Sequence, residues 1–154
     1  MNTKAKTHLS LYVKDIQKTK AFYQTFFGME ATKEKEGYLK FNIESPALVI
    51  SFLEDPLKAQ RLPGHLGFQV DSMEELKVWH DTVRAKGYQT LEEMQTNCCY
   101  ALQDKFWIND PDENAWEVYV FHQDSEFNDP KYASASEEAC CVSPQQNEKA
   151  SACC

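Results

Sequence analysis

HLSLYVKDIQKTKAFYQTFFG at residues 8–28 and HLGFQVDSMEELKVWHDTVRAKG at residues 65–87 repeat one pattern, from which the fold can be predicted. Each begins with histidine and alternating apolar residues, which predicts a strand, and then changes to the spacing of an amphipathic helix. Aligned on the histidines, the apolar residues coincide at Leu9/Leu66, Leu11/Phe68, Val13/Val70, Ile16/Met73, Phe22/Trp79 and Phe26/Val83. An internal repeat of this kind predicts two modules of the same fold.

The second helix has clear boundary signals. Ser72 followed three residues later by Glu75 forms a capping box, and Gly87 predicts the end of the helix. Between them lies a predicted buried stripe of Met73, Leu76, Trp79 and Val83. The first helix is expected over residues 15–27 and ends at Gly28.

After each helix the hydrophobic period changes to two, which predicts strands. The predicted strands are YLKFNIE (38–44), ALVISFLE (47–54), YQTLEEM (88–94), DKFWIND (104–110) and AWEVYVF (115–121). The order is βαβββ, twice, which is an α+β fold. We expect one domain over residues 1–122, with module one at about 6–54 and module two at about 64–121.

Residues 123–154 have few apolar side chains and no sustained period, so we expect a flexible tail. The six cysteines form three adjacent pairs, Cys98-Cys99, Cys140-Cys141 and Cys153-Cys154, of which the last two lie in this tail. Neighbouring cysteines are poor disulfide partners, which favours soft-ligand chemistry. The tail pairs either capture thiophilic ligands or have no role.

Composition limits the partners. A formal net charge of -8 argues against nucleic acid and anionic membranes, which carry charge of the same sign. The sequence has no long apolar run, and its first residues lack the apolar core of a signal peptide. We therefore expect a cytoplasmic protein that binds neither nucleic acid nor membranes; composition leaves open whether it is a monomer or a homodimer.

The stretch DPDENAWEVY at residues 110–119 carries a specific resemblance. It resembles the Asp-Pro-Asp-Gly-Asn turn and last strand of the vicinal oxygen chelate superfamily, which includes glyoxalase I, extradiol dioxygenases and the fosfomycin and bleomycin resistance proteins. The resemblance implies that the two modules form a half-open, eight-stranded barrel-like cleft around a metal or ligand. Glu113 stands where the family has glycine, which is expected to strain the turn.

The resemblance also implies three metal ligands: His8, His65 and Glu117. Two imidazoles and one carboxylate leave positions open for substrate and dioxygen, and this set favours non-haem Fe(II). Taken singly, each of these residues is more often an ordinary strand residue than a ligand, but all three at repeat-equivalent or motif-fixed positions favour a metal site. His80, expected to face water on the second helix, and His122, expected just past the last strand, lack such support.

Cys98 and Cys99, together with these ligands, resemble one branch of the superfamily, the carbon-arsenic lyases. The resemblance implies that the two thiolates bind a trivalent organoarsenical, such as methylarsenite or a trivalent aromatic arsenical, which Fe(II) and dioxygen then cleave to arsenite. Alternatives are a protein that sequesters arsenicals or cadmium, and a glyoxalase or fosfomycin-resistance type of metalloenzyme. One thiol could also be plain core.

The shape of residues 96–103 follows from this assignment. Successive side chains of a strand point to opposite faces, so an extended segment could not direct both thiols to one arsenic. We therefore predict a mobile loop at 96–103. Nearby, Lys105 is expected either to stabilise an anionic oxygen species or to be an ordinary exposed lysine, and Phe106, Trp107 and Trp116 to be pocket walls or core.

Overall fold

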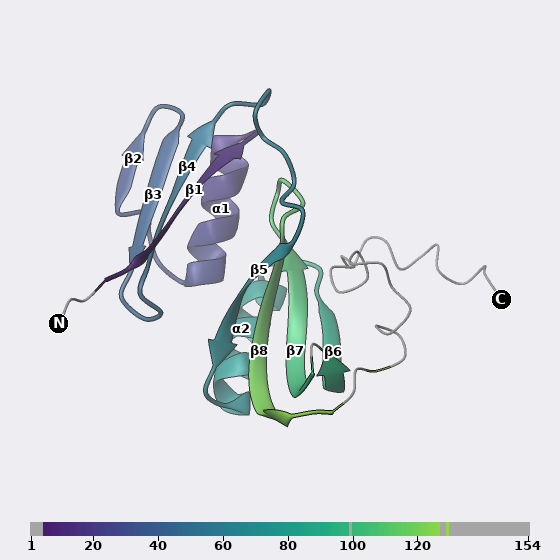
Figure 1. Ribbon diagram of the computed structural model, residues 1–154. Helices are drawn as coiled ribbons and strands as arrows, with labels where there is room; N and C mark the ends of the chain where they lie inside the picture. The colour runs from purple at the N-terminus through teal and green to yellow at the C-terminus, as the bar shows by residue number, and fades with distance from the viewer. Residues whose placement is uncertain (1–4, 99, 127–128, 130–154) are drawn as a thin grey trace. The chain divides into compact units, whose positions relative to one another are not determined.

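The computed structural model describes residues 5–98, 100–126 and 129, which fall into two compact units (Figure 1). Unit 1 comprises Met1–Arg61 with Asp110–Asp112, and unit 2 comprises Leu62–Asn109 with the chain from Glu113 onward. Cys99 and the four tail cysteines lie outside the described residues. None of the described helices is long and apolar enough to cross a membrane.

Unit 1 is a four-stranded sheet with one helix on its face (Figure 1). Its elements are β1 (Thr7–Val13), α1 (Ile16–Phe27), β2 (Lys33–Lys35), β3 (Tyr38–Ile43) and β4 (Leu48–Glu54). The strand order is β1-β4-β3-β2, with β1 parallel to β4 and the other pairs antiparallel. Its core contains an aromatic cluster of Phe22, Tyr23, Phe26, Phe41 and Phe52, together with aliphatic residues.

Unit 2 repeats this topology. Its elements are β5 (His65–Val70), α2 (Met73–Ala85), β6 (Leu91–Cys98), β7 (Ala101–Asn109) and β8 (Ala115–Asp124), in the order β5-β8-β7-β6. Only β5 and β8 are parallel. The prediction of an α+β fold with two βαβββ modules is confirmed, while the eight-stranded barrel stays a prediction.

Both helices begin where their capping residues predict. The side chain of Asp15 accepts hydrogen bonds from two backbone N–H groups of the first turn, so Asp15 is the N-cap of α1 and the helix itself begins at Ile16. Gly28 ends α1 with a φ of 65°, a left-handed conformation that glycine adopts without strain. In α2, Ser72 Oγ accepts from Glu75 N at 3.1 Å. Met73, predicted to be buried, is 38% exposed.

The predicted extent of the loop, residues 96–103, is wrong, whereas its mobility stays a prediction. β6 continues to Cys98 and β7 begins at Ala101, with Cys98 and Ala101 paired across the two strands. The alternation that reveals a strand is interrupted at Gln95, which has a φ of 49° at a β-bulge where the register of β6 shifts. His122 also lies within a strand, because β8 extends to Asp124.

Candidate metal and thiol site

Unit 2 has a cavity of about 330 Å³ on the face of its sheet opposite α2. Its walls include His65, Cys98, Gln103, Lys105, Trp107 and Glu117. The period of two explains this gathering: residues 103, 105 and 107 of β7 and residue 117 of β8 point to one face, while their neighbours point toward α2. The unit therefore brings two of the three predicted metal ligands into the same cavity as one predicted arsenic ligand.

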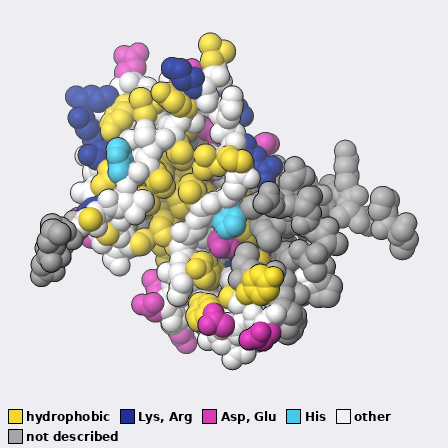
Figure 2. All heavy atoms as spheres, viewed as in Figure 1, with side chains coloured by type: hydrophobic (Ala, Val, Ile, Leu, Met, Phe, Trp, Pro, Cys, Tyr) yellow, Lys and Arg dark blue, Asp and Glu magenta, His cyan; other side chains and the backbone are white. Residues whose placement is uncertain are grey.

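His65 and Glu117 are in contact. Nε2 of His65 lies 3.5 Å from Oε1 of Glu117, and their side chains are 30% and 13% exposed. Figure 2 shows histidine and acidic side chains together at the surface of unit 2, with hydrophobic side chains around them. An imidazole nitrogen and a carboxylate oxygen at this separation are suitable donors for one divalent metal ion.

Gly67 makes room for this contact. It lies two residues after His65 on the same face of β5 and is paired with Glu117 of β8. A Cβ atom at Gly67 would lie 2.7 Å from Cγ of Glu117 and 2.8 Å from the Glu117 carbonyl oxygen. Glycine is therefore required here for Glu117 to lie across β5 beside His65.

Lys105 is buried in this site with its side chain 1% exposed, so the alternative of an ordinary exposed lysine is wrong. Its Nζ lies 3.3 Å from Oε2 of Glu117 and 4.9 Å from the centroid of the Trp107 ring. Burial alone would lower the pKa of Lys105. The Glu117 carboxylate and the Cys98 thiol, with a smaller contribution from Glu93, outweigh burial, so the pKa of Lys105 lies above its ordinary value.

Glu117 is held in its charged form by the same contacts. Burial alone would raise the pKa of its carboxyl group. The interaction with His65 and the positive charge of Lys105 outweigh burial, so the pKa lies below its ordinary value. A carboxylate that is ionised at neutral pH is ready to bind a metal ion without first losing a proton.

Cys98 lies at the end of β6 as a buried thiol, 2% exposed. Nε2 of Gln103 donates a hydrogen bond to the Cys98 carbonyl oxygen at 3.1 Å and so fixes the backbone of this residue. Oε1 of Gln103 is buried without a hydrogen-bond partner among the described residues. An unsatisfied acceptor in a cavity wall is costly unless a ligand or water supplies a donor.

His8 lies in unit 1, on β1, where it is exposed and paired with Val49 of β4. The structure thus brings His65, Glu117 and Cys98 together and describes His8 on a separate unit. Among the described residues, no group of three His, Cys, Asp or Glu side chains is close enough to hold a metal ion. His65 and Glu117 fit a metal ion as a pair of donors, which needs at least one more ligand.

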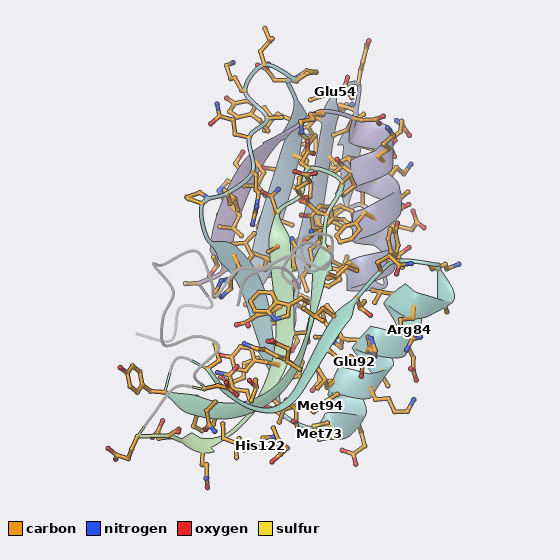
Figure 3. The ribbon with its side chains drawn as sticks, turned by 90° about the vertical axis from the view of Figure 1, so that its right-hand side faces the viewer. Glu54, Met73, Arg84, Glu92, Met94 and His122 are labelled. Carbon is orange, nitrogen blue, oxygen red and sulfur yellow. The ribbon has the colours of Figure 1, made fainter. Side chains whose placement is uncertain are left out.

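A larger cavity, of about 440 Å³, lies between α2 and strands β6 and β7. Figure 3 shows Met73 and Arg84 of α2 near Glu92 and Met94 of β6 in this region. His80 lines the cavity but is 8% exposed, so its predicted position toward water is wrong. Its Nε2 is 2.8 Å from the Thr90 hydroxyl oxygen, and burial lowers its pKa. No predicted metal or arsenic ligand that the structure describes lines this larger cavity, whereas His65, Glu117 and Cys98 line the smaller one.

Phe106, Trp107 and Trp116, each predicted to be either pocket wall or core, lie on different faces of the sheet. Trp107 lines the site and donates a hydrogen bond from Nε1 to Oε2 of Glu93 at 3.0 Å. Trp116 is core, stacked on Phe68 with ring centroids 5.3 Å apart, and Phe106 is buried on the α2 side. Sequence analysis missed Gly67, Glu93 and Gln103, although the alternation of β7 could have found Gln103 once Lys105 and Trp107 were placed.

The turn that carries the resemblance is built from polar contacts within unit 1. Asp110 accepts hydrogen bonds from Tyr23 Oη at 2.7 Å and from the Asp112 backbone N–H at 2.9 Å, and Asp112 in turn accepts from Lys14 N. Directly after it, Glu113 has a φ of 67°. This is the left-handed conformation that favours glycine, so the expected strain at Glu113 is confirmed.

Comparison with known proteins places the chain in a family. The Glyoxalase/Bleomycin resistance protein/Dioxygenase superfamily matches residues 7–118. A trivalent organoarsenical cleaving enzyme of Bacillus sp. (strain MD1) is 39% identical over 148 residues, covering 95% of this chain and 88% of the relative. The cadmium-induced protein CadI of Mycobacterium bovis (strain ATCC BAA-935 / AF2122/97) is 36% identical over 122 residues, covering 79% and 80% of the two chains.

Among solved structures, the fosfomycin resistance protein FosX of Listeria monocytogenes, complexed with Mn(II) and sulfate ion, is similar with a TM-score of 0.57 and 27% sequence identity. The match covers 77% of this chain and 90% of that protein.

Proposed function

Because the chain belongs to the Glyoxalase/Bleomycin resistance protein/Dioxygenase superfamily, we propose that it is a metal-dependent enzyme that cleaves the carbon-arsenic bond of trivalent organoarsenicals. The observation that carries this proposal is the presence of the Cys98 thiol in the same cavity as His65 and Glu117. The relative named as a trivalent organoarsenical cleaving enzyme supports the choice of substrate class.

Capture of the substrate is assigned to Cys98 and Cys99. A trivalent arsenical, R–As(OH)₂, exchanges two As–O bonds for two As–S bonds, and the two thiol protons leave with the two hydroxyl groups as water. Thiolates are the reactive form, and the ammonium of Lys105 beside Cys98 favours negative charge there. Gln103 fixes the Cys98 backbone, so the captured arsenic is held at the wall of the cavity.

The metal ion is proposed to be Fe(II), held by His65 and Glu117 with His8 as the third ligand. His8 is included because it occupies the position in the first repeat that His65 occupies in the second. Bound Fe(II) supplies the redox chemistry with dioxygen, by which the organic group is oxidised and arsenite is released. The residues of the chain orient the arsenical toward this centre and exclude water from it.

The experiment is chromatographic separation of arsenic species after the chain is incubated with methylarsenite. Arsenite is expected to form when both Fe(II) and dioxygen are present, and to be absent under strict anaerobiosis or after chelation. A His65→Ala variant should lose bound iron and turnover together. Release of arsenite at an unchanged rate by metal-free protein under a chelator would refute the proposal.

A second candidate is sequestration without turnover, favoured by the similarity to a cadmium-induced protein. Sequestration uses the thiols but needs neither iron nor dioxygen. It predicts that methylarsenite remains bound and chemically unchanged in air with Fe(II) present, so the same chromatogram separates the two functions.

A further inference from the structure

The two carboxylate oxygens of Glu117 have different partners. Oε1 faces His65 Nε2 at 3.5 Å, whereas Oε2 faces Lys105 Nζ at 3.3 Å. A carboxylate can bind a metal through one oxygen or through both. In this site the oxygen beside His65 is available to share a metal ion with it, while the second oxygen is already engaged by an ammonium group.

Lys105 is fixed firmly in this position. Its Nζ also lies 3.9 Å from Oε2 of Glu93, which is paired with Lys105 across β6 and β7. The same Glu93 oxygen accepts the hydrogen bond from Trp107, whose ring lies beneath the ammonium group. A buried ammonium is stable only when it is paired, so the two carboxylates and the indole ring together keep Lys105 next to Glu117.

We propose that Lys105 is a positioning residue that restricts Glu117 to one-oxygen metal binding and thereby keeps one more coordination position open for substrate. This inference rests on the metal site proposed above. A bidentate Glu117 would occupy two of six positions. With Oε2 held by Lys105, Glu117 occupies one, and about three positions stay open beside three protein ligands.

The test uses Mn(II) as the probe, because the number of water molecules on bound Mn(II) is measurable from water-proton relaxation and from line broadening in ¹⁷O-enriched water. We compare the wild-type chain with Lys105→Met, which removes the ammonium but retains much of the apolar volume, and with Lys105→Arg, which retains a cationic donor. Circular dichroism of each variant verifies folding.

For Lys105→Met, Oε2 of Glu117 is freed and is expected to join the metal, so one bound water is lost and relaxivity falls by about one third. Mn(II) affinity should be at least that of the wild type, because a cation near the site has been removed. Lys105→Arg should retain wild-type hydration. A structural role of Lys105 alone would instead weaken Mn(II) binding in Lys105→Met and leave hydration unchanged.

Unchanged hydration in a folded Lys105→Met variant, or weaker Mn(II) binding, would overturn the inference. If Lys105→Met does not fold, the wild type still decides: about two waters on its Mn(II) instead of about three would mean that Glu117 is already bidentate. Failure of the wild type to bind Mn(II), or binding unaffected by His65→Ala, would instead refute the proposed metal site.

Discussion

Replacing Gly67 by Ala tests whether the close approach of β5 to Glu117 builds the site. The added Cβ would lie 2.7 Å from Cγ of Glu117, about 0.7 Å inside the 3.4 Å at which ordinary contact begins. Rotating the Glu117 side chain relieves only part of the overlap, because the carbonyl oxygen of the paired strand is also 2.8 Å away. Overpacking of this kind costs about 1–3 kcal/mol of stability.

The displacement also moves a metal ligand, and loss of a supporting contact in a metal site weakens affinity by about 10- to 100-fold. Urea unfolding of the metal-free protein measures the first effect, and calorimetric titration with Mn(II) measures the second. Gly64→Ala is the matched control, because a Cβ at Gly64 has no neighbour within 4 Å. If Gly67→Ala equals Gly64→Ala in both measurements, Gly67 does not position Glu117.

Four further variants test other parts of the chain. Cys98→Ser should weaken methylarsenite binding at least about tenfold, measured as arsenic retained after desalting, and should leave Mn(II) affinity unchanged. Replacing the four tail cysteines by serine is expected to change neither methylarsenite binding nor Mn(II) affinity. Asp104→Asn should make stability less sensitive to acid. Burial alone would raise the pKa of Asp104, but hydrogen bonds from Gln95 N and His122 outweigh it and lower the pKa below its ordinary 3.8. The folded state therefore binds fewer protons than the unfolded state, and the stability contributed by this carboxylate above about pH 4 is lost as pH falls further. Between about pH 5 and pH 3, urea unfolding should show a smaller decline in the free energy of unfolding for Asp104→Asn than for the wild type. An equal decline would contradict this assignment. Glu113→Gly should raise the free energy of unfolding by about 0.5–1 kcal/mol, because the residue adopts a φ of 67°; a loss of stability would show that Glu113 makes compensating contacts.

The secondary structure could be predicted where local rules decide it. Asp15, Gly28 and Ser72 fix helix ends through contacts with their near neighbours in sequence, so the sequence contains the whole cause. The extent of β6 could not be predicted in this way. Its last residues are polar, and they are paired because β7 lies beside them, on the far side of a bulge that interrupts the alternation.

The burial of polar side chains was harder to predict from the sequence than the secondary structure. His80 lies four residues after Leu76 and three before Val83, so its place on the buried stripe of α2 was visible in the spacing. Lys105 gave no such signal. Its burial depends on Glu117, which is twelve residues later on a neighbouring strand, and on Glu93 across the sheet. Only the register of three strands brings these charges together.

The contacts in this site extend across the whole sheet of unit 2. From the edge strand β6 to the opposite edge strand β5, Glu93, Lys105, Glu117 and His65 form a continuous series, with one residue from each strand. Two carboxylates facing one ammonium leave a net negative charge, which favours binding of a divalent cation where His65 supplies a neutral nitrogen. The ammonium that separates the two carboxylates also lies beside Cys98. One buried lysine therefore connects the proposed metal ligand with the proposed arsenic ligand, and a change at Lys105 is expected to affect both.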